Sequence, residues 1–332
     1  MKAHVIEQYG KAPLKMVEVP IPEVGEYDVL AEIHSASLNP VDFKIRDGKL
    51  KVLLKYDMPL ILGSDFSGIV TQVGSKVSRF KVGDEIYSKT PKNQMGTWAE
   101  FVAVREDAIA LKPANLTFEE AAAIPLVGLT SYQVLHDVLE VKKGQRLLIQ
   151  AGSGGVGTFA IQLAKEMGAY VATTVSDAGV DLVKSLGADK VINYKAEKFE
   201  DVLSDYDAVY DTLGGEFLEK AFRIVKPGGN IVSISGLPNA RFGKEYGVGI
   251  IKTGFFSLIS RKLTQLEKQY GVRYTFLFMS HSGKQLQIIG ELIEKGKIKP
   301  VVDRVFPFNE AQDAVQYIES GRAKGKVVIK IK

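Results

Sequence analysis

The sequence predicts an α/β protein in which a doubly wound parallel sheet accompanies a second, β-rich domain. A short apolar run at residues 147–151 passes through a glycine cluster into a segment of helical periodicity, the pattern of strand, tight turn and helix. Strand-like and helix-like segments then alternate to about residue 236, whereas residues 1 to about 110 are short strand-like runs separated by glycine, proline and aspartate. Such alternation implies a parallel sheet that binds its ligand at the carboxyl ends of the strands.

The β-rich start of the chain reads as a partly closed, barrel-like antiparallel domain, with runs such as DVLAEIHSASL, FSGIVTQV and AEFVAV. The segment that follows it is helical. Thr117 precedes Glu120 in the pattern of a capping box, and Pro125 interrupts the helical run. We interpret residues 116–140 as the crossing between the domains.

The glycines of the central motif, Gly152, Gly154 and Gly157, fit G-x-G-x-x-G. The first permits the turn, the second lets a ligand approach the backbone, and the third lets helix and strand pack closely. The helix that follows would present free N–H groups and the positive end of its dipole, which suits a pyrophosphate. Glycine clusters also occur in ordinary turns, so the evidence for a dinucleotide site depends on the strand before the motif and the helix after it.

The second strand of this half is expected at Tyr170–Val175, and three further strand-like runs follow it. Residues 237–270 then read as irregular, rich in glycine beside an apolar, basic stretch. Two interpretations stay open for them, a packed cap, or a mobile lid or membrane-touching helix. Beyond lie a strand-like VRYTFLFM, an amphipathic helix around Leu286–Ile293, and a last strand, KGKVVIKIK, expected to rejoin the first domain.

Composition narrows the class of protein. The chain has 332 residues, enough for two domains with full cores, and its 45% hydrophobic and 25% charged residues are typical of a globular protein. A net charge of +4 without dense basic runs argues against nucleic acid as a partner. The lack of cysteine excludes disulfides and thiolate metal sites and fits a reducing compartment. We find no signal peptide or membrane span and expect a cytoplasmic protein.

Seven segments resemble one known family along nearly the whole chain. They are SLNPVDFKIRDG (37–48), PLILGSDFSGIVTQVG (59–74), FKVGDEIY (80–87), AAAIPLVGLTSYQVL (121–135), AGSGGVG (151–157), SLGADKVINY (185–194) and GKIKPVVDRVFPF (296–308). The family is the zinc-independent medium-chain dehydrogenases/reductases, in their branch of quinone oxidoreductases and enone (alkenal) reductases. The resemblance implies a GroES-like catalytic domain, 1–125 completed by 297–332, and an NADPH-binding Rossmann domain, 126–296.

Zinc-dependent members of the family place metal ligands where this chain has Asn39, Ser64 and Leu126. None of these offers a thiolate or an imidazole, so we expect no metal site. Hydrogen bonds or a cation must then polarise the substrate carbonyl, which suits conjugated acceptors better than simple alcohols.

The choice of cofactor depends on the end of the second Rossmann strand, where an acidic residue would select NAD. Alignment on SLGAD puts Thr174 there, and the resemblance gives Ser176 and Tyr194 as donors to a 2′-phosphate, which favours NADPH. Asp177 would oppose a phosphate, and Lys184, Lys190 or Lys195 could supply the missing positive charge.

The resemblance also assigns residues to the reaction. It puts Asn39 near the nicotinamide, gives Lys44 a role in fixing cofactor or substrate and steadying an enolate oxygen, and leaves Asp42 as a structural residue that orients the loop. Alternatively, Lys44 is a surface lysine. Further cofactor contacts are expected at Thr130, Ser153, Gly154, Gly155, Val156, Leu213, Gly236, Phe276 and Phe278.

The predicted function is NADPH-dependent reduction of conjugated enones, alkenals or quinones. The alternatives are a strict quinone reductase and a noncatalytic NADPH-binding protein. The alternating aromatics of VRYTFLFM, Tyr274, Phe276 and Phe278, suggest an edge strand that pairs across a two-fold axis in a homodimer. In the competing interpretation, residues 237–270 of a monomer fold over that edge.

Overall fold

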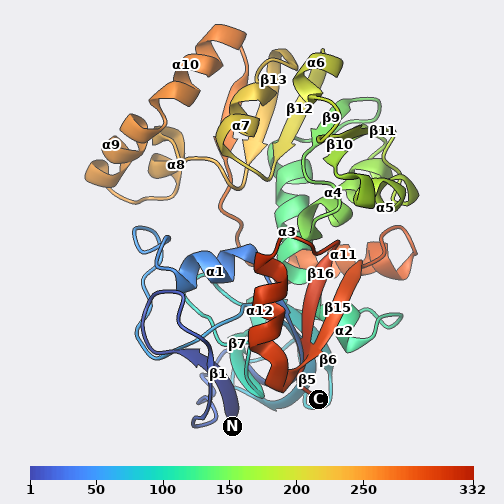
Figure 1. The fold of residues 1–332 in the computed structure, drawn as a ribbon. Helices are drawn as coiled ribbons and strands as arrows, with labels where there is room; N and C mark the ends of the chain where they lie inside the picture. Colours follow the sequence, from blue (N-terminus) through green and yellow to red (C-terminus); the bar gives the residue numbers. More distant parts are fainter. The chain divides into compact units, whose positions relative to one another are not determined.

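The computed structural model describes all residues, 1–332, and divides them into two compact units. Unit 1 consists of Met1–Leu129 and Ser280–Lys332, and unit 2 consists of Thr130–Met279. Unit 2 is therefore continuous in sequence, whereas unit 1 is built from both ends of the chain (Figure 1).

Unit 1 is organised around two sheets, as the β-rich pattern predicts. The seven-stranded sheet has the order β15 (Val302–Pro307), β16 (Lys326–Lys330), β3 (Asp28–Leu38), β5 (Asp65–Val73), β6 (Glu85–Lys89) and β8 (Ile109–Leu111), with β7 (Phe101–Arg105) also paired to β3. The smaller sheet is β2 (Lys15–Glu18), β1 (Lys2–Ile6) and β4 (Leu60–Ile61). β16 runs antiparallel to β3, so the last strand of the chain completes the unit.

Unit 1 also contains helices, some of which pack against strands of the larger sheet. They are α1 (Pro40–Arg46), α2 (Phe118–Ala122), α11 (Gly283–Glu294) and α12 (Ala311–Glu319), with single turns η1 (Glu106–Ala108) and η4 (Phe308–Glu310). The Thr117 hydroxyl accepts a hydrogen bond from the N–H of Glu120 at the start of α2, which confirms the predicted capping box. α3 (Pro125–Tyr132) begins at Pro125, where proline can only start a helix, and continues as a π-helix, η2 (Gln133–Val138).

Unit 2 contains a six-stranded parallel sheet, in agreement with the predicted alternation. Its order is β11 (Lys190–Asn193), β10 (Tyr170–Val175), β9 (Arg146–Ile149), β12 (Tyr206–Asp211), β13 (Val225–Ser233) and β14 (Arg273–Phe276). The connections are α4 (Gly155–Glu166), η3 (Asp177–Gly179), α5 (Val180–Ser185), α6 (Phe199–Val202) and α7 (Gly215–Ala221). The strand order reverses between β9 and β12, which is where doubly wound sheets bind their ligands.

Residues 237–270 are helical, so the prediction of an irregular segment was wrong. They form α8 (Ala240–Glu245), α9 (Ile250–Ile259) and α10 (Arg261–Tyr270), which extend from the β14 edge of the sheet (Figure 1). The glycines that suggested irregular backbone separate the helices instead, because Gly247 and Gly249 have φ of +68° and +84° and Gly271 ends α10 at +65°. No helix of the chain combines the length and the apolar character needed to cross a lipid bilayer.

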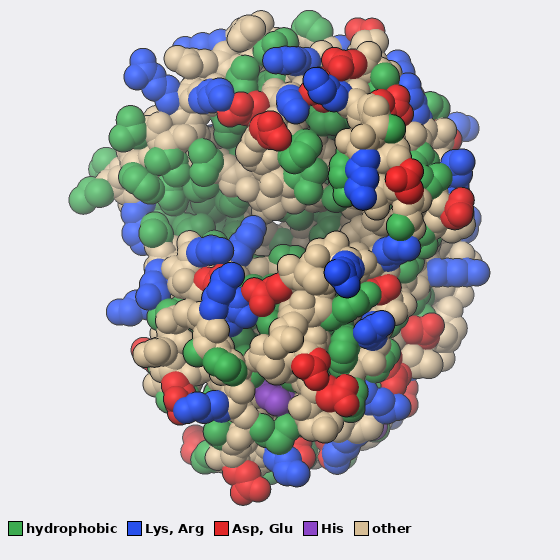
Figure 2. Space-filling model, in the orientation of Figure 1, with side chains coloured by type: hydrophobic (Ala, Val, Ile, Leu, Met, Phe, Trp, Pro, Cys, Tyr) green, Lys and Arg blue, Asp and Glu red, His purple; other side chains and the backbone are tan.

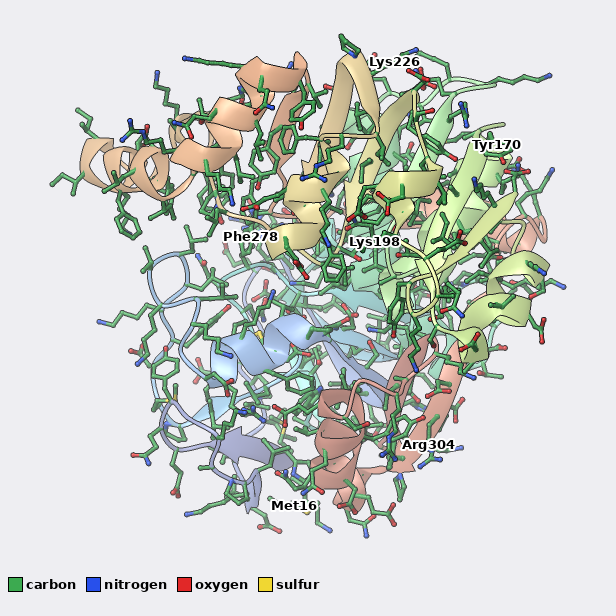
Figure 3. The ribbon with its side chains drawn as sticks, turned by 45° about the horizontal axis from the view of Figure 1, so that its top comes forward. Met16, Tyr170, Lys198, Lys226, Phe278 and Arg304 are labelled. Atoms are coloured by element: carbon green, nitrogen blue, oxygen red, sulfur yellow. The ribbon has the colours of Figure 1, made fainter.

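The strand predicted over VRYTFLFM is shorter than expected. β14 ends at Phe276, and Phe278 lies in the loop that follows it (Figure 3). The alternation of aromatic residues therefore extends beyond the hydrogen-bonded strand, and only Tyr274 of the three is fully buried.

Candidate cofactor and catalytic residues

The helix α4 begins without a side-chain cap at its N-terminus. Its N-cap is Gly154, and the first N–H groups of a helix have no partner within the helix. A Cβ on Gly152 would lie 2.1 Å from Oγ1 of Thr173, and one on Gly157 would lie 2.5 Å from the carbonyl oxygen of Ala151. A Cβ on Gly154 would meet only that oxygen, at 3.3 Å, so the space before the helix is open. An open, uncapped helix start fits the pyrophosphate of a dinucleotide.

The residues predicted to bind the cofactor in unit 2 gather along one edge of the sheet. Ser176 follows β10, Tyr194 follows β11, Leu213 follows β12 and Gly236 comes soon after β13. Because the strands are parallel, their carboxyl ends share an edge with the start of α4, where Ser153, Gly155 and Val156 lie (Figure 1). Thr130, by contrast, is a buried residue of α3.

Thr174 braces the glycine loop. Its hydroxyl oxygen accepts a hydrogen bond from the N–H of Ala151 at 3.1 Å, and its carbonyl oxygen accepts one from the N–H of Gly152 at 3.0 Å. The side chain is 5% exposed, whereas that of Tyr194 is 56% exposed. Of the three residues expected at a 2′-phosphate, Ser176 and Tyr194 are therefore the accessible ones.

The three lysines that could pair with a 2′-phosphate lie at different edges of the sheet. Lys190 opens β11, and its Nζ donates to the carbonyl oxygen of Val202 at 2.9 Å. Lys184 lies near the end of α5, which leads back to the start of β11. Both therefore belong to the amino edge of the sheet. Lys195 follows the carboxyl end of β11 directly after Tyr194 and is exposed.

The carboxylate of Asp177 is held by its neighbour strand. Its Oδ1 accepts a hydrogen bond from Nδ2 of Asn193 at 2.5 Å. Asp177 begins the short turn η3, two residues after the end of β10, rather than standing at the end of the strand where a ribose-binding acid belongs.

A buried aspartate that sequence reasoning missed orders the loop after β12. Asp211 accepts hydrogen bonds from the N–H groups of Leu213 and Gly214 at 3.1 and 2.9 Å, and from the hydroxyl of Ser233. Burial raises the pKa of its carboxyl. The signal was a charged residue that closes an apolar strand three residues before a glycine pair, a place where a carboxylate can accept from loop N–H groups.

Side chains from α8 and α10 form hydrogen bonds with backbone groups of the edge strand β14. The N–H of Tyr274 donates to Oε1 of Glu267 at 2.8 Å, and its carbonyl oxygen accepts from Arg241 at 2.8 Å. Phe276 packs edge-on against Phe242, with ring centroids 5.0 Å apart. Pairing of two β14 strands at Tyr274 would have to displace these groups, which favours the interpretation in which residues 237–270 cover the edge.

In unit 1, Asn39 belongs to a buried polar network. Its Nδ2 donates to Oδ2 of Asp65 at 3.0 Å, and its Oδ1 accepts from Nζ of Lys326. The same Asp65 oxygen accepts from the hydroxyl of Ser37 at 3.0 Å, and Lys326 also donates to the carbonyl oxygen of Leu38 at 3.0 Å. The orientation of the Asn39 amide is thereby fixed, since its oxygen faces a cation and its nitrogen faces a carboxylate.

Asp42 holds the start of α1, the structural role expected for it. Its Oδ2 accepts a hydrogen bond from the N–H of Asn39 at 2.8 Å, and its Oδ1 has no partner although the side chain is fully buried. Burial raises the pKa of Asp42 to about 7, with the neighbouring Asp65 acting in the same direction. Burial likewise lowers the pKa of Lys89 and Lys326.

Lys44 stands apart from this network. It lies near the end of α1 and is half-buried, and burial, followed by the charge of Lys49, lowers the pKa of its ammonium group. A partly desolvated cation at such a position can stabilise a developing negative charge on a ligand.

The positions that carry zinc ligands in other members of the family do not fit a zinc ion here. Asn39 supplies an amide already bonded on both sides, Ser64 a buried hydroxyl, and Leu126 a hydrocarbon. No group of three His, Cys, Asp or Glu side chains in the structure is arranged to hold a metal.

Comparisons with known proteins identify the family. The alcohol dehydrogenase GroES-like domain matches residues 25–114, and the zinc-binding dehydrogenase family matches residues 186–329. The chain is 38% identical to a 2-methylene-furan-3-one reductase of Solanum lycopersicum over 99% of this chain and 79% of the relative. It is 36% identical, with the same coverage, to an NADPH-dependent alkenal/one oxidoreductase of Arabidopsis thaliana.

Solved structures agree with these relatives. The quinone oxidoreductase of Coxiella burnetii is 34% identical, with a TM-score of 0.85 over 100% of this chain and 99% of the other. The Escherichia coli quinone oxidoreductase, solved as a complex with NADPH, is 26% identical with a TM-score of 0.84 over 100% of both chains. The relatives and neighbours are thus named as a reductase, an alkenal/one oxidoreductase and quinone oxidoreductases, and this chain matches the GroES-like domain of the alcohol dehydrogenases. The chain belongs to the medium-chain dehydrogenase/reductase family, in the branch that contains the quinone oxidoreductases and enone reductases.

Proposed function

We propose that the protein is an NADPH-dependent reductase of conjugated enones, alkenals or quinones, with unit 2 as the cofactor-binding domain and unit 1 as the catalytic domain. The observation that carries the proposal is the open, uncapped start of α4 at the same sheet edge as Ser176, Tyr194 and Lys195. The names of the enone- and alkenal-reducing relatives support the class of substrate.

The preference for NADPH rests on the residues around the end of β10. No carboxylate ends that strand, and Asp177 is engaged by Asn193. Ser176 and Tyr194 supply hydroxyl groups, and Lys195 supplies a charge, so a 2′-phosphate has donors and a cation.

The chemistry is a two-electron reduction of a conjugated double bond. Bound NADPH supplies a hydride to the β-carbon of an enone or alkenal, or to a quinone, and is oxidised to NADP⁺. Lys44 steadies the negative charge that develops on the carbonyl oxygen, and Asp65 and Lys326 fix the orientation of the Asn39 amide. The enolate is then protonated by water or by a side chain.

A screen of NADPH oxidation over enones, alkenals and 1,4-quinones tests the activity. We expect turnover of at least one conjugated carbonyl compound. Turnover of quinones alone would replace the proposal by a strict quinone reductase. Tight NADPH binding without turnover of any acceptor would establish the noncatalytic alternative.

The role of Lys44 has a test of its own. Lys44→Met should lower kcat/KM for the acceptor by roughly 10²-fold and leave the NADPH dissociation constant unchanged, because the lost cation acts on the substrate oxygen. Lys49→Met is the matched control, since Lys49 is an exposed lysine of the neighbouring turn, 3.4 Å from Asp47. Equal activity of both variants would return Lys44 to the status of a surface lysine.

A further inference from the structure

The outward face of α9 carries four exposed apolar side chains, and the exposed Lys252 and Ser257 lie outside the arc that they cover. Ile250 is 92% exposed, Ile251 90%, Leu258 69% and Phe255 51%. At 100° per residue these four side chains fall within an arc of about 140° around the helix axis. The opposite side faces unit 2, where Phe256 is buried and its ring centroid lies 6.1 Å from that of Phe242. Figure 2 shows the resulting hydrophobic patch at the left, where Figure 1 places α9.

This face has no cover within the chain. A Cβ added at Gly247, Gly249 or Gly254 would meet no atom within 4 Å, so the surface is open both along the helix and at the turn before it. Single exposed apolar residues are ordinary, but four on one helix face form a contiguous patch of the kind that binds a partner. A packed cap would bury this face of α9, whereas a membrane-touching helix would leave it exposed in the free protein, as it is here.

The segment that contains the patch, residues 237–270, has a net positive charge. Residues 237–270 contain six Lys or Arg residues and two Glu. One of the two, Glu267, lies 3.6 Å from Arg241 and accepts the N–H of Tyr274. The exposed Lys244, next to the exposed Glu245, precedes the helix in sequence, the exposed Lys252 lies on it, and the exposed Arg261 follows it.

We propose that α9 docks on the surface of an anionic lipid bilayer. The four apolar side chains would enter the boundary between headgroups and acyl chains, while Lys244 and Arg261 meet lipid phosphates. The helix has ten residues, which suits a helix lying in the interface rather than one that crosses the membrane. A second copy of the chain is the less suitable occupant, because two such faces brought together would oppose their positive charges.

Vesicle flotation tests the proposal on the full chain. The probes are vesicles of phosphatidylglycerol and phosphatidylcholine in equal parts, and vesicles of phosphatidylcholine alone. We expect the protein to float with the anionic vesicles and to bind the neutral ones at least tenfold more weakly. The partition coefficient of Ile250→Glu/Ile251→Glu on anionic vesicles should be at least tenfold lower than that of the wild type. Lys244→Gln/Arg261→Gln should bind anionic and neutral vesicles equally.

The control is Val82→Glu, which introduces a single carboxylate at an apolar residue of unit 1 that is 61% exposed. It should float like the wild type. Unchanged circular dichroism and melting temperature of Ile250→Glu/Ile251→Glu would show that the loss is not one of folding, as expected for side chains that make few contacts.

Three results would overturn the inference: no flotation of the wild type with anionic vesicles, equal flotation of the wild type and Ile250→Glu/Ile251→Glu, or a wild-type dimer by light scattering that the same variant converts to a monomer. The last result would assign the face to a second copy. Flotation needs neither cofactor nor substrate, so the outcome is independent of the proposed reductase activity.

Discussion

Nζ of Lys326 lies 3.7 Å from Oδ2 of Asp65, and the two side chains are 5% and 0% exposed. The pair joins β16, near the end of the chain, to β5, and Asn39 is bonded to both partners. A buried ion pair of this kind is costly to break from one side, because the remaining charge has no water to solvate it.

Lys326→Met should therefore lower the free energy of unfolding of unit 1 by about 3–5 kcal/mol. Trp98, the single tryptophan of the chain, is fully buried in unit 1, so its fluorescence in a urea titration reports that unit. Lys330→Met is the matched control on the same strand, since its exposed pair with Glu119 contributes about 0–1 kcal/mol. Similar losses in both variants would contradict a special role for the buried pair.

Asp42 should make stability depend on pH. Its pKa is raised to about 7 in the folded protein from an ordinary value of 3.8, so the folded state holds a proton that the unfolded state has lost. The corresponding stability is fully present below pH 4 and is lost as the pH rises through about 7. The free energy of unfolding of Asp42→Asn, measured relative to that of the wild type, should therefore rise by about 1.4 kcal/mol or more between pH 4 and pH 8.

The measurement is again urea unfolding followed by Trp98 fluorescence, repeated across that pH range. Asp57→Asn, at an exposed aspartate, should reproduce the pH dependence of the wild type. A constant difference between Asp42→Asn and wild type at all pH values would mean that Asp42 does not titrate in this window.

Gly154→Val should abolish tight NADPH binding while leaving the fold intact. The backbone of Gly154 has φ of −78°, which valine adopts, and a Cβ there has room, but the branched side chain would occupy the space before the helix start. We expect the dissociation constant, measured by NADPH fluorescence, to rise by roughly 10²-fold or more, about 2.7 kcal/mol. Gly254→Val, in open space on α9, serves as the control, and an unchanged dissociation constant for Gly154→Val would refute the pyrophosphate site.

Lys195→Gln should reduce discrimination between the cofactors. Loss of a cation beside the 2′-phosphate is expected to lower kcat/KM with NADPH about tenfold, roughly 1.4 kcal/mol, and to leave kcat/KM with NADH unchanged. Lys184→Gln, at the amino edge of the sheet, should affect neither cofactor. Equal use of NADPH and NADH by the wild type would remove the premise of a phosphate site.

We expect a monomer rather than the predicted homodimer, because Arg241 and Glu267 already bind the outward backbone groups of Tyr274. Light scattering at micromolar concentration should give a mass near 36.4 kDa. Twice that mass, together with its loss in Phe276→Pro, would show that β14 pairs across a two-fold axis after all.

Local patterns were sufficient to predict much of the fold. Tyr170–Val175 is a strand with the predicted bounds, and Pro125 starts a helix where it was expected to interrupt one. Both follow from properties of adjacent residues, namely β-branched enrichment and the missing proline N–H. The prediction for residues 237–270 was wrong because it also used a local property. Glycine frequency alone does not say whether a glycine lies within a helix or between two helices.

The polar network of unit 1 could not be predicted in this way. Asn39, Asp65 and Lys326 are far apart in sequence, and only the pairing of β16 with β3 and of β3 with β5 brings them together. The local signal for Asp65 and Lys326 was a charge at the start of a strand-like run, in GSDFSG and GKVVIKI, and Asn39 had no such signal. Which partner satisfies such a charge depends on strand order, which periodicity does not reveal.

The pairing of β16 with β3 also sets an order of events during synthesis. All residues of unit 2 leave the ribosome before Lys326–Lys330, so the nucleotide-binding half can fold while the first half still lacks a central strand. Until that strand is available, β3 lacks its pairing with β16 and Asp65 lacks the positive charge of Lys326, and a nascent chain stalled there is a candidate for chaperones. Ribosome-bound chains ending before and after residue 326 would therefore differ in the protease resistance of the first half and agree in that of the second.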